Sequence, residues 1–172
     1  AEAGVEALLL LDDNRPTTLK QRYRSKGKSL LRVSHLHQGA ISAALQTQLL
    51  TALEQALDGA DLLVFSDFNY GCLPQPLVDQ LIDMAKSCDV LMAADSQSSS
   101  QVGDISRFKG MHLITPTERE ARISTRNWED GLVVLAEQLR LSATAYNVLL
   151  KLGEEGLLIH AGNGKEDAWL TD

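Results

Sequence analysis

The chain has 172 residues, of which 44% are hydrophobic and 23% are charged, with a formal net charge of −7. This apolar fraction excludes a disordered chain, the length suits one domain, and no apolar run reaches the roughly 18 residues of a membrane-spanning helix. The net acidity argues against a nucleic-acid partner, and the two cysteines lack the spacing of a zinc site or a disulfide framework, so we expect a cytoplasmic protein without nucleic-acid or membrane partners.

Apolar periodicity predicts strands that alternate with helices along the chain. In chain order, the pattern predicts a strand at 7–11, a hairpin of 17–25 and 29–35, a helix at 42–58, a strand at 61–66, a helix at 74–87, strands at 90–94 and 112–115, helices at 118–124 and 127–139, and strands at 147–152 and 157–161. Asn127 and Asp130 resemble a capping box for the last helix. Continuously apolar strands between helices are typical of parallel strands buried on both faces. We therefore predict an α/β fold, a three-layer αβα sandwich around a mostly parallel sheet, with a small β hairpin.

A basic ribbon runs from Arg15 to Arg32 and carries seven of the sixteen cationic residues of the chain and no acid. From residue 20 to residue 28 the cations occupy alternate positions, and alternate residues of a strand share a face. Such a cationic face beside Thr17 and Thr18 suits an anionic ligand such as a sugar phosphate. The alternative is a solvated edge strand whose charges protect it from aggregation.

Polar residues follow the predicted strand at 61–66, at the end where open α/β sheets bind ligands. Asp67 and Asn69 can bind the hydroxyl groups of a polyol there. The alternative is a plain turn, since both residue types favour turns ahead of a helix.

Two further segments also follow predicted strands. Thr117 can cap the next helix with Glu120 as the capping-box acid, whereas a functional Glu120 would order water around Mg²⁺. After Lys151, Gly153 and Gly156 either form a turn or let the backbone approach a nucleotide.

These motifs occur in a fixed order along nearly the whole chain: Arg-Pro-Thr-Thr at 15–18 with Lys20 and Arg22, Ser66-Asp67-Phe68 with Gly71, Asp95, Thr115-Pro116 with Glu120, and Lys151-Leu152-Gly153 with Gly156. The order resembles that of the ribokinase-like carbohydrate kinases. Within them it is most similar to the heptose-7-phosphate kinases, the kinase half of bifunctional ADP-heptose synthases.

The resemblance implies phosphoryl transfer from ATP to a sugar or sugar phosphate, helped by Mg²⁺. It implies a substrate lid at about 15–38, and Glu120 would act on Mg²⁺ through water. Lid strands pair between subunits in such kinases, so a homodimer is implied as well. The substrate residues would be Arg15, Thr17, Thr18, Lys20, Arg22, Asp67 and Asn69, and the nucleotide residues Thr117, Glu120, Lys151, Gly153 and Gly156.

Three positions depart from the family pattern. Tyr70 and Gln97 stand where the family usually has lysines, and Thr117 stands where it has the Asn of Asn-x-x-Glu. Either the substrate carries less negative charge than usual, or the chain belongs to a weakened or non-catalytic branch.

The family motif Asp-x-x-Gly-Ala-Gly-Asp, whose last Asp is the general base, does not occur in the sequence. We therefore expect residues 1–172 to be the central part of a single kinase domain, without the first βα units and the C-terminal catalytic motif, and inactive alone. The alternatives are a non-catalytic nucleotide- or sugar-binding module and an interaction domain with a vestigial cleft.

Overall fold

The computed structural model describes residues 4–97, 103–162 and 168–170. Its main sheet has six strands in the order β3-β4-β5-β6-β7-β8. The first four run parallel, and the last two are antiparallel to their neighbours. The strands are β3 (Leu62–Asp67), β4 (Leu91–Ser96), β5 (Leu113–Ile114), β6 (Asn147–Lys151), β7 (Leu157–Ala161) and β8 (Ala168–Leu170). The predicted α/β class with a mostly parallel sheet is confirmed.

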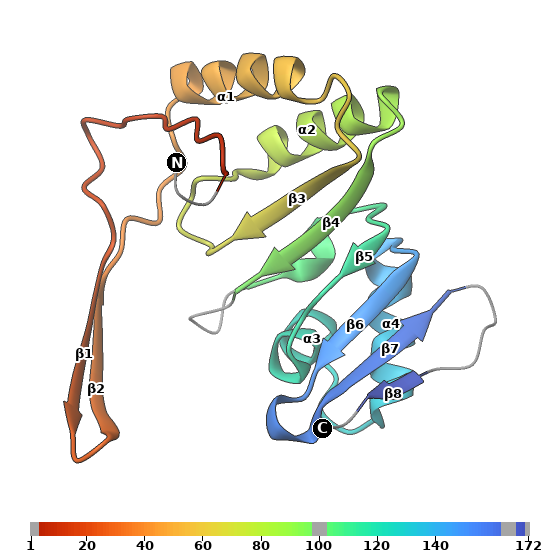
Figure 1. The fold of residues 1–172 in the computed structure, drawn as a ribbon. Helices are drawn as coiled ribbons and strands as arrows, with labels where there is room; N and C mark the ends of the chain where they lie inside the picture. Colours follow the sequence, from red (N-terminus) through yellow and green to blue (C-terminus); the bar gives the residue numbers. More distant parts are fainter. Residues whose placement is uncertain (1–3, 98–102, 163–167, 171–172) are drawn as a thin grey trace.

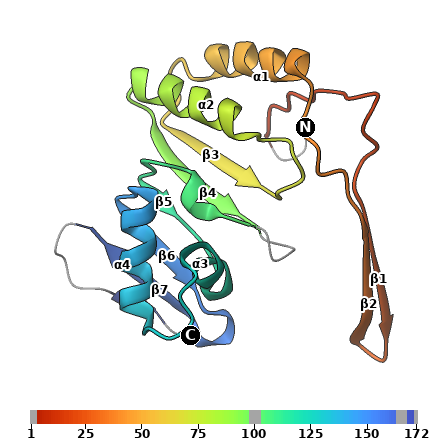
Figure 2. The same cartoon turned by 180° about the vertical axis from the view of Figure 1, so that it is seen from behind.

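The described residues form four helices, of which the last three lie between parallel strands of the sheet and cover one face of it (Figures 1 and 2). They are α1 (Ala43–Ala56), α2 (Gln75–Ser87), α3 (Glu118–Thr125) and α4 (Leu132–Ala143), with short 3₁₀ turns η1 (Ile105–Arg107) and η2 (Gly153–Glu155). Helix α1 lies on α2, farther from the sheet. This arrangement places all the βα loops at the carboxyl ends of the parallel strands.

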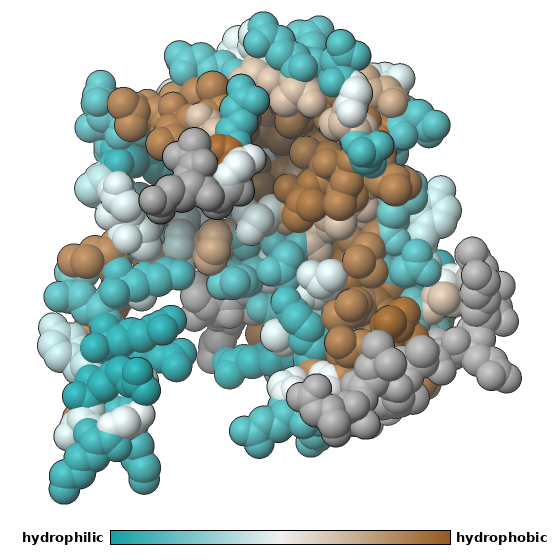
Figure 3. Space-filling view, in the orientation of Figure 1, coloured by the Kyte–Doolittle hydropathy of each residue, from teal (hydrophilic) through white to brown (hydrophobic). Residues whose placement is uncertain are grey.

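Burial alternates along the strands because only one sheet face lies against helices. Met92 and Ala94 are buried beneath the helices, whereas Leu62, Val64 and Leu91 are 51%, 55% and 51% exposed on the other face. This face gives the apolar surface in the middle of Figure 3. The described residues therefore supply the sheet and the helical layer of one side.

A separate two-stranded hairpin, β1 (Leu19–Ser25) with β2 (Lys28–His35), projects from the body, as predicted (Figure 1). Lys26 and Gly27 form its turn with φ angles of 46° and 81°, the left-handed conformation that tight hairpin turns require. Both strands are mostly exposed. The hairpin is therefore held by its base and by a few side chains, not by a core of its own.

One predicted strand is absent, one predicted helix has different bounds, and one strand was not predicted. Residues 7–11 form no strand. Leu8, Leu9 and Leu11 are 68%, 82% and 84% exposed, and an apolar run becomes a strand only where a neighbour pairs with it. The helix predicted at 127–139 begins at Leu132, because the Asn127 side chain accepts from the Asp130 amide and closes a turn before it. Strand β8 was not predicted.

The capping box of Thr117 and Glu120 is confirmed. The Thr117 hydroxyl accepts from the Glu120 amide at 3.3 Å, and the Glu120 carboxylate accepts from the Thr117 amide at 2.8 Å. Together these bonds satisfy two backbone donors at the start of α3.

Helix α4 is tied to the sheet by a charged cluster that supports a prediction about acid stability. Glu137 accepts from Arg140 at 2.6 Å and lies 2.7 Å from Nε2 of His160 on β7. The bond from Arg140, and then that from His160, lowers the pKa of Glu137 from 4.5 to about 2. A carboxylate with a lowered pKa stabilises the fold above its unfolded pKa, and this contribution is lost as the pH falls from about 4.5 through about 2.

We expect Glu137→Gln to remove this part of the acid sensitivity. Urea unfolding of both proteins at pH 7, 4 and 2.5 measures it. The stability deficit of the variant relative to wild type should shrink as the pH falls, whereas a deficit that is constant with pH contradicts the assignment.

Candidate functional site

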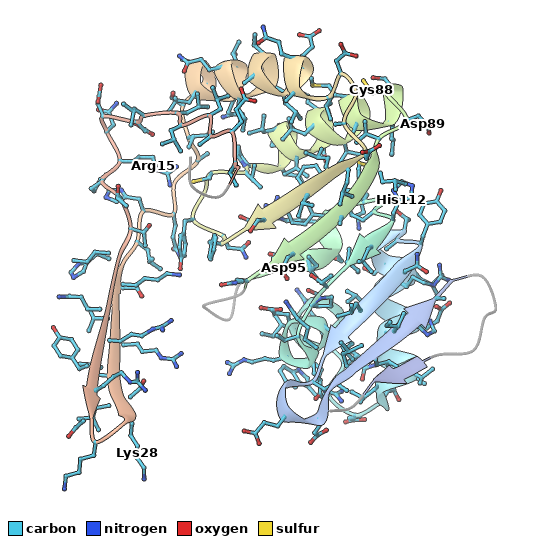
Figure 4. The ribbon with its side chains drawn as sticks, viewed as in Figure 1. Arg15, Lys28, Cys88, Asp89, Asp95 and His112 are labelled. Carbon is cyan, nitrogen blue, oxygen red and sulfur yellow. The ribbon has the colours of Figure 1, made fainter. Side chains whose placement is uncertain are left out.

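The carboxyl ends of β3, β4, β5 and β6 lie at one edge of the sheet because these strands are parallel. This edge gathers polar side chains from distant parts of the sequence (Figure 4, where Asp95 is labelled). They are Asp67 at the end of β3 and Asn69 after it, Asp95 near the end of β4, Thr115 and Thr117 after β5, and Lys151 at the end of β6.

Asp95 joins three of these strands. Its Oδ1 accepts from the Lys151 ammonium at 2.8 Å and from the Thr115 hydroxyl at 3.0 Å. The Lys151 and Asp95 side chains are 40% and 31% exposed, so both reach the surface of the edge. The backbone amide of Lys151 also donates to Pro116, which sets β6 beside the start of α3. The Lys151 ammonium group is thus held at this edge by its ion pair with Asp95.

Asp67 is the most enclosed of the predicted site residues, with its side chain only 3% exposed. Its Oδ2 accepts from Arg107 at 2.7 Å, and its Oδ1 accepts from the backbone amide of Asn69 at 2.9 Å. Arg107 also donates to the carbonyl of Leu73 and lies over the ring of Phe108. Both carboxylate oxygens are therefore engaged within the protein.

Asn69 links the ends of β3 and β4. Its Nδ2 donates to the hydroxyl of Ser96 and to the carbonyl of Gln97, each at 3.0 Å. Its φ of 57° lies in the left-handed region, which asparagine tolerates better than most residues. The β3–α2 loop, residues 68–74, is thereby held in one conformation by Asp67 and Asn69.

The predicted nucleotide residues lie beside Lys151. Thr117 pairs with Lys151 as an isolated parallel bridge, Gly153 begins the η2 turn that follows, and Gly156 comes directly after this turn. Both glycines have positive φ angles, 67° and 91°, which other residues rarely adopt. Glu120 is 8% exposed in the capping box. Within the part of the chain that the structure describes, no three His, Cys, Asp or Glu side chains gather as a metal site.

The predicted sugar-phosphate residues fall into two groups. Lys20 and Arg22 lie on the hairpin, and Lys20 Nζ is 4.9 Å and 5.1 Å from the ring centroids of Phe68 and Tyr70. The cationic hairpin face is therefore turned toward the β3–α2 loop, across the open space between hairpin and body in Figure 3.

The second group surrounds the base of the hairpin. Arg15, Thr17 and Thr18 line a pocket of about 660 Å³ that continues between α1 and β3 over apolar side chains. The Arg15 guanidinium donates to the carbonyls of His37 and Tyr70. Arg15 therefore connects the segment that follows β2 to the β3–α2 loop.

Gly71 lies tightly against the backbone of Gly39, in the segment that follows β2. Its φ is 80°, and a Cβ at this position would lie 2.1 Å from the carbonyl oxygen of Gly39. The Ile41 amide also donates to the Gly71 carbonyl at 3.1 Å. No residue other than glycine fits there without a backbone shift.

We expect Gly71→Ala to cost at least about 2 kcal/mol of unfolding free energy, since backbone strain and overpacking each cost about 1–3 kcal/mol. Thermal unfolding measures the loss. Gly131→Ala is the control, because a Cβ there meets nothing within 4 Å and its φ is negative. Equal effects at the two glycines would contradict the close approach.

Arg107 is absent from the motifs and candidate residues read from the sequence, whereas Phe68 and Thr115 stand there only as motif members and not as site residues. Arg107 precedes a Phe-Lys-Gly segment with no motif spacing, and its partner Asp67 lies forty residues away. Of the two partners, only Asp67 was among the site residues predicted from the sequence.

Comparison with known proteins decides the family. The family model described as "pfkB family carbohydrate kinase" matches residues 1–168. The chain belongs to the pfkB family of carbohydrate kinases. This family membership confirms the resemblance to ribokinase-like kinases drawn from the motifs.

Curated relatives include the D-beta-D-heptose 7-phosphate kinase of Bordetella bronchiseptica, 31% identical over 98% of this chain and 52% of the relative. The Bifunctional protein HldE of Caulobacter vibrioides is 34% identical over 94% of this chain and 31% of its own length. The chain thus spans about half or a third of these relatives.

Solved structures agree on the fold. The ribokinase of Giardia lamblia superimposes with a TM-score of 0.75 at 17% identity, over 98% of this chain and 55% of that one. Escherichia coli phosphofructokinase-2 in complex with fructose-6-phosphate gives a TM-score of 0.64 at 17% identity, over 90% and 50%. No helix among the described residues is long and apolar enough to span a membrane.

Proposed function

We propose that this pfkB-family chain forms part of an ATP-dependent sugar-phosphate kinase of the heptose-7-phosphate kinase type, which serves ADP-heptose biosynthesis. The observation that carries the proposal is the cationic hairpin face turned toward the carboxyl edge of the sheet. Lys20 and Arg22 supply charges for an anionic substrate at one end of this edge. The Bordetella relative, named for heptose 7-phosphate, supports the choice of substrate.

The other end of the edge suits ATP. Lys151 presents an ammonium group beside the glycine turn, which runs from Gly153 to Gly156. Because glycine has no side chain, a nucleotide can approach the backbone closely there. Thr117 lies next to Lys151 at the start of α3. In the proposed site Lys151 contacts a phosphate, and Glu120, which also closes the capping box, holds a water of a bound Mg²⁺.

Catalysis in such a site rests on positioning and on charge stabilisation. The hairpin cations hold the sugar phosphate. Asp67 and Asn69 fix the β3–α2 loop, which forms the sugar-binding end of the site. Magnesium, when bound, neutralises developing phosphate charge. The chain contains no Gly-Ala-Gly-Asp segment and hence no such Asp to take the proton from the attacking hydroxyl.

We expect the 172-residue chain to bind heptose 7-phosphate saturably in calorimetry and to release no ADP from ATP in a coupled assay. Robust turnover by the 172 residues would overturn the expected inactivity. If the chain binds ATP or an unphosphorylated sugar but does not bind heptose 7-phosphate, the result would favour a non-catalytic module. A chain that binds none of these ligands would favour an interaction domain.

We also propose that the hairpins pair between two copies of the chain. The hairpin face opposite Lys20 carries Leu19, Tyr23 and Leu31, which are 53%, 51% and 55% exposed. A second hairpin would bury them. Sedimentation equilibrium tests this proposal. Wild type should form a dimer, and the double variant Tyr23→Ser with Leu31→Ser should be a monomer. A monomeric wild type would contradict the proposal.

A further inference from the structure

The hairpin face that carries Lys20 holds more positive charge than the sequence motifs assign to the site. Arg22 shares this face with Lys20, because alternate residues of a strand point to the same side. In the hairpin register Arg32 lies directly opposite Arg22. Residues that are directly opposite on an antiparallel pair share a face, with Cβ atoms about 5 Å apart. Arg32 therefore belongs to the face that is turned toward the β3–α2 loop.

The opposed pair of Arg22 and Arg32 favours the binding of an anion. Like charges directly opposite each other destabilise a strand pair. Neither Arg22 nor Arg32 forms an ion pair with another described residue, and residues 15–32 contain no acid. A phosphate between the two guanidinium groups would remove the repulsion and could accept two hydrogen bonds from each.

The loop supplies a fixed position for the third cation. The rings of Phe68 and Tyr70 stack with centroids 6.0 Å apart and planes 24° apart, and Lys20 lies over both. Such a contact attracts the ammonium group to the rings while N–H donors on its other side remain turned outward. The loop itself is held by Asp67 and by Arg15, which donates to the Tyr70 carbonyl. Lys20 is thus ordered before a ligand arrives, which lowers the entropic cost of binding.

We infer that Arg32 joins Lys20 and Arg22 in one three-cation site for a phosphate monoester, and that Phe68 and Tyr70 are positioning residues that hold Lys20 in it. The inference rests on the proposed function and deepens it. It restricts the substrate to a sugar that already carries a phosphate. Tyr70, at a position where a lysine would be expected, then holds a cation that comes from the hairpin.

Calorimetry with heptose 7-phosphate and, separately, with ATP tests the role of Arg32. Arg32→Gln should weaken heptose 7-phosphate binding at least 10-fold and leave ATP binding unchanged. Lys28→Gln is the matched control, since it removes one charge from the same strand at the far tip of the hairpin (Figure 4), and it should change binding less than 2-fold. Equal effects of the two variants, or none, would overturn the inference.

The role of the rings has its own readout. In wild type, ring currents should shift the NMR signal of the Lys20 ε-methylene protons upfield, and Phe68→Leu with Tyr70→Leu should abolish the shift. The same double variant should weaken heptose 7-phosphate binding 3- to 10-fold, whereas Tyr70→Phe should keep both the shift and the affinity. Unchanged affinity in the double variant would show that the rings do not position Lys20.

Different results would overturn the three-cation site and the proposed function. If wild type binds heptose 7-phosphate but Arg32→Gln and the ring variant bind it equally well, the inference is wrong and the proposed function stands. If wild type binds neither heptose 7-phosphate nor ATP, both are wrong.

Discussion

Replacing Arg107 with Met should lower the free energy of unfolding by about 3 kcal/mol, because removal of one partner strands a buried charge. Asp67, with its side chain 3% exposed, would lose its only ion pair among the described residues. The Leu73 carbonyl would lose a donor as well. The value lies at the low end of the usual range, because the Arg107 side chain is 18% exposed and some water can reach the pair. Urea unfolding followed by circular dichroism measures the change.

The control for this substitution is Arg119→Met. Arg119 is exposed on α3, so its replacement removes the same charge without opening a buried pair, and it should change stability by less than about 0.5 kcal/mol. A double variant, Asp67→Leu with Arg107→Met, should lose less stability than the sum of its single variants, since no unpaired charge remains. Strict additivity would show that the two side chains do not act as a pair.

Reversing two charges on the hairpin should affect the proposed substrate far more than the nucleotide. Lys20→Glu with Arg22→Glu should weaken heptose 7-phosphate binding by about 100-fold, equivalent to about 2.7 kcal/mol. Two charge-assisted hydrogen bonds, each worth about 1.5–3 kcal/mol, account for a loss of at least this size. ATP binding should change little, because Lys151 and the glycine turn lie at the other end of the edge. Calorimetric titration with each ligand measures both effects.

Lys26→Glu with Lys28→Glu is the matched control for this change. It alters the net charge by the same amount at the tip of the same hairpin, away from the sheet (Figure 4). If the tip variant loses as much affinity as the Lys20 and Arg22 variant, binding depends on overall charge and not on the hairpin face. Equal loss of both ligands, or no loss, would refute the assignment of the hairpin as the substrate lid.

Much of the fold was predictable because its signals are local. The apolar runs of β3, β4, β6 and β7 and the Lys26-Gly27 turn are readable within a few residues. The capping box of Thr117 and Glu120 spans only four. The run at 7–11 carries the same kind of signal, yet it forms no strand, since strand formation also requires a partner edge.

The sequence by itself therefore determined the α/β class, the cationic alternation of the hairpin and the motif order that resembles the carbohydrate kinases. Tertiary structure alone decided which charges meet. It pairs Asp67 with Arg107, Asp95 with Lys151, and Lys20 with two rings, across forty or more residues in each case. No periodicity links such partners, because their distance is set by how parallel strands and their loops align at one edge. For the same reason, the sequence shows at Tyr70 only the loss of a lysine, whereas in the structure the Tyr70 ring contacts the Lys20 ammonium group.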